Sequence, residues 1–212
     1  MNNIILTILV VIAGYLLGSF PSAYIAARLV KGKDIREIGE GNMGALNAMR
    51  GVGFLPGLLV FVADVLKGAA AVILAKSLGA LPLAVFLAGT AAVAGHSWPV
   101  FRHFKGGRGG ATAYGVLAGL APLPGVIVFF IMLLTMMLTS NARLSLMAGF
   151  IAMPVLMWLF RLELAVIIFA VVLPLLLAVR MLAMDWRKLR DPATMRNLIV
   201  DHNYTWWQKR KR

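Results

Sequence analysis

The sequence predicts an all-α integral membrane protein, and two observations carry that prediction. The 212-residue chain is 61% hydrophobic and only 14% charged, with a mean hydropathy of +0.87. Soluble domains average about 25% charged and about 45–50% apolar residues, so an ordinary soluble fold is excluded. The apolar residues also gather in runs suited to membrane helices, which need about 20 residues each. We identify seven such runs: Ile4 to Leu29, Phe54 to Ala75, Leu81 to Gly95, Ala111 to Leu120, Val126 to Leu138, Leu146 to Phe160 and Leu164 to Met184.

The first run is the longest and contains a break signal, Gly18-Ser19-Phe20-Pro21. A proline inside a helix removes a hydrogen bond and kinks the chain, so we predict a kink there. No Lys or Arg precedes this run and no clear small-x-small cleavage site follows, which favours a retained helix over a signal peptide. The third, fourth and sixth runs are short for a full crossing, and Ala121 to Gly125 predicts a turn.

The basic residues predict the orientation in the membrane. If the N-terminus lies outside, seven crossings put the C-terminus inside, and the inside segments then hold 18 of the 21 Lys and Arg residues. Basic residues concentrate in cytoplasmic segments of membrane proteins. We therefore predict a multi-pass membrane protein whose glycine-rich loops face the cytoplasm. Residues 1–212 would form a single membrane domain, with a basic tail, residues 185–212, whose Trp residues suit a membrane interface.

Composition also excludes several kinds of site. The absence of Cys removes disulfides, thiolate metal ligands and thiol nucleophiles. The three His residues, His96, His103 and His202, are scattered among few carboxylates, which predicts no metal site. We also expect no cofactor. We expect no nucleic-acid partner, because the net charge of +13 is spread over short segments at the predicted membrane surface.

The segment Gly95 to Thr112, GHSWPVFRHFKGGRGGAT, is the strongest candidate for chemistry. Its second half holds four Gly (Gly106, Gly107, Gly109 and Gly110), which stand beside Arg102, Lys105 and Arg108. Repeated Gly lets backbone N–H groups approach an anion closely, while the cations supply charge. The segment lacks the Gly-x-x-x-x-Gly-Lys-Ser/Thr spacing of a nucleotide-binding loop and follows no strand, so ATP binding is excluded. The composition predicts phosphate binding at the edge of a membrane.

A second polar segment, Val30 to Arg50, has a related composition. Three glycines allow a sharply folded backbone, while two amides and a guanidinium can donate to an oxyanion: Gly39, Gly41, Gly44, Asn42, Asn47 and Arg50. Taken alone, this pattern is typical of a flexible cytoplasmic loop, and phosphate binding is the alternative.

Asp64 and Lys67 are the charged residues inside the second run. Three residues apart, they share a helix face and can pair, which lowers the cost of both charges in the membrane. We expect a structural ion pair that sets helix packing. The alternative is a direct contact between Lys67 and a substrate.

Five motifs follow one another in a specific order: Gly18-Ser19-Phe20-Pro21, Asp34-Ile35-Arg36, Gly39-x-Gly41-Asn42-x-Gly44-Ala45-x-Asn47-x-x-Arg50, Asp64-x-x-Lys67-Gly68, and Gly95-His96-x-x-Pro99-Val100-Phe101-x-x-Phe104-Lys105-Gly106-Gly107-x-Gly109. In these motifs the chain resembles the bacterial acyl-phosphate:glycerol-3-phosphate acyltransferase family (PlsY). The resemblance extends to about Gly115, and to the number of runs and the chain length beyond it.

The resemblance implies a seven-span, multi-pass enzyme of the bacterial plasma membrane, with its active site facing the cytoplasm. In phospholipid synthesis it would transfer a fatty acyl group from acyl phosphate to the first hydroxyl of glycerol 3-phosphate. The product would be lysophosphatidic acid, and membrane lipids would be the other partners. It implies substrate phosphate contacts by Asn42, Asn47, Arg50, Lys105, Gly106, Gly107, Arg108, Gly109 and Thr112, and supporting roles for Ser19, Gly41, Lys67, His96 and Ser145. No catalytic base is evident, and a role for the substrate phosphate as base stays open.

The chain departs from the family's pattern at several positions. Glu40 replaces a Ser, and Arg108 replaces a Lys. The late Arg-Tyr-x-Ser-Leu motif is matched only loosely at Arg143 to Leu146, and the His-x-x-Asn motif of the tail has no clear counterpart. An ionised Glu40 pointing inward would repel a phosphate, so it must turn away, pair with a cation or mark a different ligand. Two alternatives follow: a related acyltransferase with another phosphate-bearing acceptor, or a non-catalytic lipid- or anion-binding paralogue.

Overall fold

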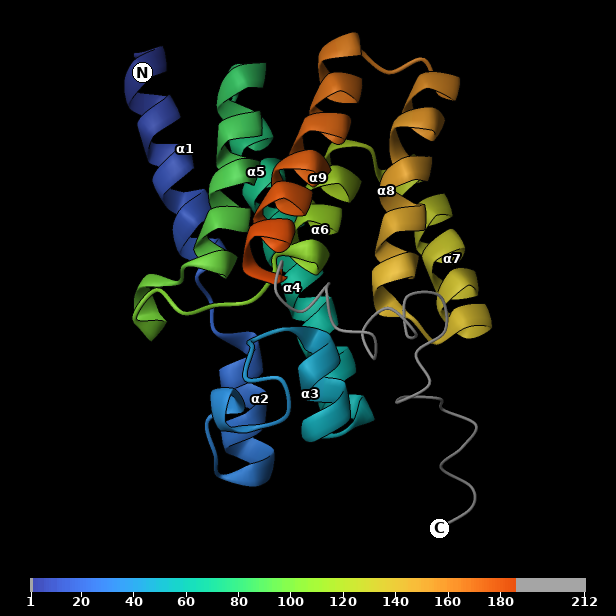
Figure 1. Cartoon of the computed structure of the whole chain (residues 1–212). Coiled ribbons are helices and arrows are strands. Elements are labelled where there is room, and N and C mark those ends of the chain that lie inside the picture. Colours follow the sequence, from blue (N-terminus) through green and yellow to red (C-terminus); the bar gives the residue numbers. More distant parts are fainter. Residues whose placement is uncertain (1, 186–212) are drawn as a thin grey trace. The chain divides into compact units, whose positions relative to one another are not determined.

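The computed structural model describes residues 2–185, and all regular structure within them is helical. The chain divides into two compact units, Met1–Pro122 and Leu123–Arg212, which are described separately (Figure 1). The first unit contains α1 (Asn3–Gly18), α2 (Ser22–Lys31), η1 (Ile35–Glu37), α3 (Ala45–Gly51), α4 (Phe54–Ser77), α5 (Pro82–Ser97), η2 (Val100–Arg102) and α6 (Gly110–Leu120). The second contains α7, which begins at the boundary (Pro122–Thr139), α8 (Ala142–Leu159) and α9 (Leu164–Asp185).

Six helical stretches of the described residues are long and apolar enough to cross a membrane: Asn3–Lys31, Phe54–Ser77, Pro82–Arg102, Pro122–Thr139, Ala142–Leu159 and Leu164–Ala183. The remaining predicted run forms α6, which has 11 residues. At 1.5 Å per residue it is about 16 Å long, roughly half the thickness of the hydrocarbon layer. The structure thus confirms an all-α, multi-pass membrane protein, whereas the count of seven spans stays a prediction.

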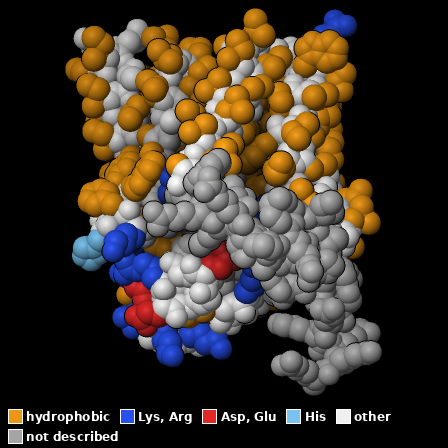
Figure 2. All heavy atoms as spheres, viewed as in Figure 1, with side chains coloured by type: hydrophobic (Ala, Val, Ile, Leu, Met, Phe, Trp, Pro, Cys, Tyr) orange, Lys and Arg blue, Asp and Glu red, His pale blue; other side chains and the backbone are white. Residues whose placement is uncertain are grey.

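The outer faces of the helices are apolar. Side chains of α1 such as Ile4, Ile8 and Ile12 are half exposed or more. Figure 2 shows hydrophobic side chains over the helices, and charged side chains of the first unit gathered at the end where α2 and α3 lie. Such extensive exposed apolar surface suits lipid contact rather than water.

The predicted kink in the first run is confirmed as a complete break. α1 ends at Gly18 and α2 begins at Ser22, after Pro21. Ser19 is fully buried at this break, and its hydroxyl donates to the Tyr15 carbonyl over 2.8 Å. The break leaves the backbone carbonyl of Phe20 outside either helix, where it accepts a hydrogen bond from the Lys67 ammonium group at 3.2 Å.

One prediction about a connecting segment was wrong, and a second segment holds more regular structure than its composition indicated. The predicted turn from Ala121 to Gly125 is mostly helix, because α7 begins at Pro122. A proline in the first helical turn is tolerated, since its missing N–H would have had no partner there. The segment Val30 to Arg50 is not simply a flexible loop, because it forms the short helices η1 and α3.

Small residues allow the helices of the first unit to approach closely. A Cβ atom at Gly14 or Gly18 of α1 would overlap the backbone of Ala88 or Ala92 of α5. A Cβ at Gly68 of α4 would likewise overlap the Thr112 carbonyl of α6. In a membrane, helices gain little from the hydrophobic effect, so such close backbone packing supplies much of their attraction.

The predicted ion pair between Asp64 and Lys67 is confirmed, and it is part of a larger buried network. Lys67 Nζ lies 2.7 Å from Asp64 Oδ1, and both side chains are more than nine-tenths buried. The Ser22 hydroxyl donates to the same carboxylate oxygen over 2.7 Å, and His96 Nδ1 lies 3.5 Å from it. Residues from α2, α4 and α5 therefore meet at one carboxylate.

This network predicts a strong asymmetry between single and double substitutions. Lys67→Met leaves a buried carboxylate without its main cation, so the free energy of unfolding should fall by about 3–5 kcal/mol. The double variant Asp64→Asn, Lys67→Met removes both charges and should recover most of that loss. Denaturant titration in detergent micelles measures both, with Lys76→Met at the exposed end of α4 as the control. Equal stability of Lys67→Met and the wild-type protein would contradict the structural role of the pair.

Candidate active site

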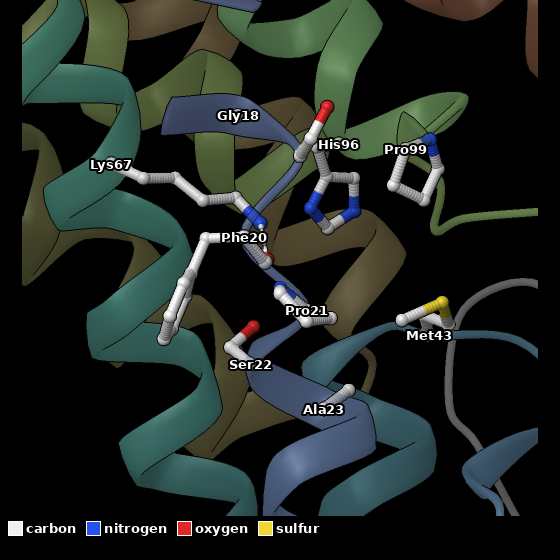
Figure 3. A pocket seen from close by; sticks show the side chains of 10 residues that line it. Gly18, Phe20, Pro21, Ser22, Ala23, Met43, Lys67, His96 and Pro99 are labelled. Atoms are coloured by element: carbon white, nitrogen blue, oxygen red, sulfur yellow. Dashed lines mark hydrogen bonds between the residues drawn. The ribbon is translucent and has the colours of Figure 1, made fainter. Parts of the chain in front are cut away.

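A small cavity lies beside the buried network, at the break between α1 and α2. It is lined by residues of α1, α2, α4 and α5, among them Phe20, Lys67 and His96, and its volume is about 10 Å³. Figure 3 shows Lys67 reaching the Phe20 carbonyl, with the His96 ring nearby. A space of this size holds about one water molecule, so no substrate fits between these side chains. A substrate phosphate therefore needs a wider space than this cavity offers in this conformation.

Two loops reach the cavity beside this network, because Met43 and Pro99 line it. We call residues 32–44 the first loop and residues 98–109 the second loop. The first follows α2, whose Ser22 binds Asp64, and the second follows α5, which carries His96. His96 also contacts the second loop directly, because its Nε2 lies where a Cβ atom of Gly107 would be. His96 therefore lies at the end of α5 from which the second loop starts, whereas Ser19 lies at the end of α1. Their supporting roles at the site stay predictions.

Asp34 ties the two loops together. Its carboxylate accepts hydrogen bonds from Arg36 of the first loop and from Arg102 of the second loop, each at 2.7 Å. The Arg102 guanidinium also lies over the Tyr24 ring of α2, 3.6 Å from its centre. Hydrogen bonds from Arg36, and the positive charges of Arg36 and Arg102, lower the pKa of Asp34 to about 2. This carboxylate therefore holds two cations in place rather than acting as a base.

Asn47 holds the first loop in shape. Its side-chain nitrogen donates to the carbonyls of Ile38 (2.9 Å) and Asn42 (2.8 Å), and its oxygen accepts from the Glu40 backbone N–H (2.9 Å). The side chain is almost fully buried. Gly39 fits because its φ of +58° and missing Cβ leave room for the Asn47 oxygen. Asn47 is therefore a loop-shaping residue in this structure, and its direct contact with a phosphate stays a prediction.

The second loop folds back over the end of α5. The backbone N–H of Gly106 donates to the Ser97 carbonyl over 3.2 Å, and that of Gly107 to the His96 carbonyl over 3.0 Å. These N–H groups therefore cap α5 in this conformation. The predicted contacts of Gly106 and Gly107 with phosphate would require both hydrogen bonds to be given up.

Glu40 pairs with cations. This is one of the three possibilities named above for a carboxylate at this position. Its carboxylate lies 3.0 Å from Arg50 Nη1 and 3.7 Å from Arg108 Nη2, and it accepts a hydrogen bond from Asn42 Nδ2 over 3.2 Å. Arg50 belongs to α3 and Arg108 to the second loop, so Glu40 brings three predicted phosphate ligands to one point. We call Glu40, Asn42, Arg50 and Arg108 the Glu40 cluster. Its pairs are partly exposed, so each stabilises the fold by only about 0–1 kcal/mol.

An open groove of about 410 Å³ lies between the two loops. It is lined by Asp34, Arg36, Glu37 and Gly41 of the first loop and by Lys105 and Gly106 of the second loop. No hydrogen bond or ion pair ties the Lys105 ammonium group to a described residue, and its side chain is exposed. The groove therefore presents a cation to a ligand, at a place that the sequence had predicted from composition.

The remaining predicted residues lie in different settings. Gly109 is the N-cap residue that precedes α6, with a φ of +88°. Thr112, in the first turn of α6, is fully buried, and its hydroxyl has no hydrogen-bond partner among the described residues. Ser145 belongs to the second unit, where its hydroxyl donates to the Met132 carbonyl over 2.6 Å. Site roles for Asp34, Arg36 and Arg102 were missed, although the spacing Asp34-x-Arg36 was visible in the sequence.

The lowered pKa of Asp34 predicts how stability depends on pH. A folded-state value near 2, below the ordinary 3.8, means that folding favours the ionised carboxylate. Its contribution is therefore full above about pH 4 and is lost as the pH falls through 2. We expect Asp34→Asn to be less stable than the wild-type protein by about 1.5–3 kcal/mol at pH 7, with the gap closing below pH 4.

Denaturant titration in detergent between pH 7 and pH 2 measures this gap. Glu37→Gln, an exposed residue of the same loop, is the control and should show no comparable loss. A difference between Asp34→Asn and the wild-type protein that stays constant down to pH 2 would contradict the role of the charge.

Known proteins are similar to this chain in sequence and in fold. The family model described as glycerol-3-phosphate acyltransferase matches residues 8–189. Glycerol-3-phosphate acyltransferase 1 of Dehalococcoides mccartyi is 39% identical over 195 residues, which cover 89% of this chain and 94% of that protein. Glycerol-3-phosphate acyltransferase of Parasynechococcus marenigrum is 46% identical over 155 residues, 73% of each chain.

Crystal structures of PlsY, an integral membrane glycerol 3-phosphate acyltransferase, show the same arrangement of helices. The glycerol 3-phosphate form has a TM-score of 0.75 and 33% identity, covering 87% of this chain and 94% of that one. The lysophosphatidic acid form has a TM-score of 0.72 and 32% identity, covering 86% and 91%. The ordered motifs, the fold and these matches agree, and the chain belongs to the glycerol-3-phosphate acyltransferase family.

Proposed function

We propose that this chain transfers a fatty acyl group from acyl phosphate to glycerol 3-phosphate and so forms lysophosphatidic acid for phospholipid synthesis. The observation that carries the proposal is the meeting of the two glycine-rich loops around a groove lined by Lys105, next to the Glu40 cluster. The family and the two ligand forms of its solved structure point to the same acceptor and product.

The reaction needs two phosphate-bearing molecules held close together. The first hydroxyl of glycerol 3-phosphate attacks the acyl carbonyl carbon, a new ester C–O bond forms, and the bond to the phosphate of the donor breaks. The hydroxyl proton leaves with the departing inorganic phosphate. Because an acyl phosphate has a good leaving group, the protein's contribution is mainly to position the two reactants and neutralise their charge.

The arrangement of side chains supports distinct roles. Lys105 in the groove and the three donors of the Glu40 cluster, Asn42, Arg50 and Arg108, are suited to bind substrate phosphates. His96 is poorly suited to act as a base, because it is buried between Asp64 and Gly107 beside a cavity that holds about one water. The departing or the accepting phosphate is the better candidate for that task.

Acyl transfer by the purified protein tests this function directly. Labelled glycerol 3-phosphate and palmitoyl phosphate should give labelled lysophosphatidic acid, whereas palmitoyl-CoA should give none. Lys105→Ala and Arg50→Ala should each lower kcat/KM by about 10- to 100-fold, since each loses a charge-assisted contact worth about 1.5–3 kcal/mol. Lys76→Ala, at the far end of α4, is the matched control for the loss of one positive charge.

Other results of this assay would point to one of the alternative functions or contradict the site. Product from another polyol phosphate alone would identify a related acyltransferase, the second candidate that Glu40 suggests. Folded protein without any acyl transfer would indicate the non-catalytic, anion-binding alternative. Full activity of Lys105→Ala and Arg50→Ala would contradict the assignment of the phosphate site.

We further propose that residues 1–212 form one membrane domain with seven crossings, the N-terminus outside, and both loops in the cytoplasm beneath the plasma membrane. The family model supports continuity, since residues 8–189 run through both units. The distribution of Lys and Arg supports the orientation.

Cysteine labelling tests this arrangement, because the native chain contains no Cys. Intact cells treated with a membrane-impermeant maleimide should label Lys76→Cys but not Lys33→Cys. Glu163→Cys, between α8 and α9, decides whether α6 and its flanking residues complete a crossing. Labelling from outside fits seven crossings, whereas protection until the cells are broken would mean six.

A further inference from the structure

Glu40 occupies the donors that a substrate phosphate is expected to use. Its two carboxylate oxygens are shared among Arg50 Nη1 at 3.0 Å, Asn42 Nδ2 at 3.2 Å and Arg108 Nη2 at 3.7 Å. A phosphate group presents oxygens of the same charge and hydrogen-bonding kind to such donors. The side chain of Glu40 therefore stands where an anion would bind.

We propose that Glu40 is an internal counter-anion that a substrate phosphate displaces, and that it thereby sets the affinity and selectivity of this site. The inference rests on the proposed function for the identity of the phosphate-bearing substrate. It assigns Glu40 as a specificity-determining residue and not as a residue that takes part in bond making or breaking.

The backbone around Glu40 is fixed, while its side chain is not. Asn47 accepts a hydrogen bond from the Glu40 N–H at 2.9 Å, and Asn47 is itself buried and bonded to the loop. The carboxylate end is different, because 36% of the Glu40 side chain is exposed. Rotation about its side-chain bonds therefore frees the carboxylate without unfolding the first loop.

The charges favour exchange with a phosphate rather than with a weaker anion. Two guanidinium groups and one carboxylate leave the cluster with one net positive charge. When the carboxylate swings out, two positive charges face the site, which match a phosphate monoester that carries nearly two negative charges at neutral pH. A singly charged anion gains less from the exchange, so Glu40 selects for doubly charged phosphates.

The contacts are weak enough to be replaced. Arg50 and Arg108 are about one quarter exposed, and the Arg108 contact at 3.7 Å is longer than a hydrogen bond. Exposed ion pairs of this kind alter an equilibrium by only a few-fold each. Loss of the competing carboxylate should therefore lower KM for the displacing substrate by about three- to tenfold.

Two neutral replacements test the proposal: Glu40→Gln, which keeps the shape, and Glu40→Ser, which shortens the side chain to the hydroxyl expected from the family. Initial rates are measured with glycerol 3-phosphate varied at saturating palmitoyl phosphate, and then with the roles exchanged. Both variants should lower one KM by about three- to tenfold while kcat stays within about twofold. Glu40→Asp keeps the charge and should lie between them and the wild-type protein.

Glu163→Gln is the matched control, because it removes one negative charge at an exposed position outside both loops. Its KM values should equal those of the wild-type protein. A lower KM for glycerol 3-phosphate assigns the cluster to the acceptor, and a lower KM for palmitoyl phosphate assigns it to the donor. Unchanged or higher values of both KM in folded Glu40→Gln would overturn the proposal, since Glu40 would then only organise Arg50 and Arg108.

Binding of inorganic phosphate keeps this test separate from the proposed reaction. Isothermal titration of wild-type protein, Glu40→Gln and Glu163→Gln in detergent needs no turnover. A Kd lowered about three- to tenfold in Glu40→Gln alone supports the counter-anion even if the protein makes no lysophosphatidic acid. Equal Kd values in the three proteins overturn it, even if lysophosphatidic acid is formed.

Discussion

The first unit depends on the contacts of one buried carboxylate, that of Asp64. It is shielded from solvent and held by Lys67 and Ser22, with His96 at 3.5 Å. A buried charge is tolerated only while its partners stay in place, so α2, α4 and α5 must keep their relative positions. Lys67 also donates a hydrogen bond to the Phe20 carbonyl at the helix break. The network therefore holds together the start of α2, the middle of α4 and the end of α5 from which the second loop leaves.

The two loops combine contacts that are costly to break with contacts that are easily replaced. Asp34 binds Arg36 and Arg102 with short hydrogen bonds, and the buried Asn47 holds the turn around Glu40. The contacts of Glu40 are longer and partly exposed. Since buried or short charge-assisted contacts are costly to break and exposed ones are not, the loops can keep their shape while their anion partner changes. A site that binds and releases phosphates needs this combination.

Much of the architecture could be predicted from the sequence because it depends on local pattern. Apolar runs predict membrane helices wherever they occur, a proline predicts a break, and a spacing of three places Asp64 and Lys67 on one helix face. Glycines beside Lys and Arg predicted the two loops that line the groove. The predicted turn at Ala121 to Gly125 failed, because proline is compatible with the first turn of a helix as well as with a loop.

The sequence by itself thus determined the membrane class, most helices and the two phosphate-binding candidates, since hydropathy and spacing act over a few residues. Only the tertiary structure decided how those candidates are used. It pairs Glu40 with Arg108, gives the N–H groups of Gly106 and Gly107 to α5, and turns Asn47 towards the backbone. These contacts join residues that are distant in the chain or depend on the exact course of a loop. No local pattern encodes such contacts.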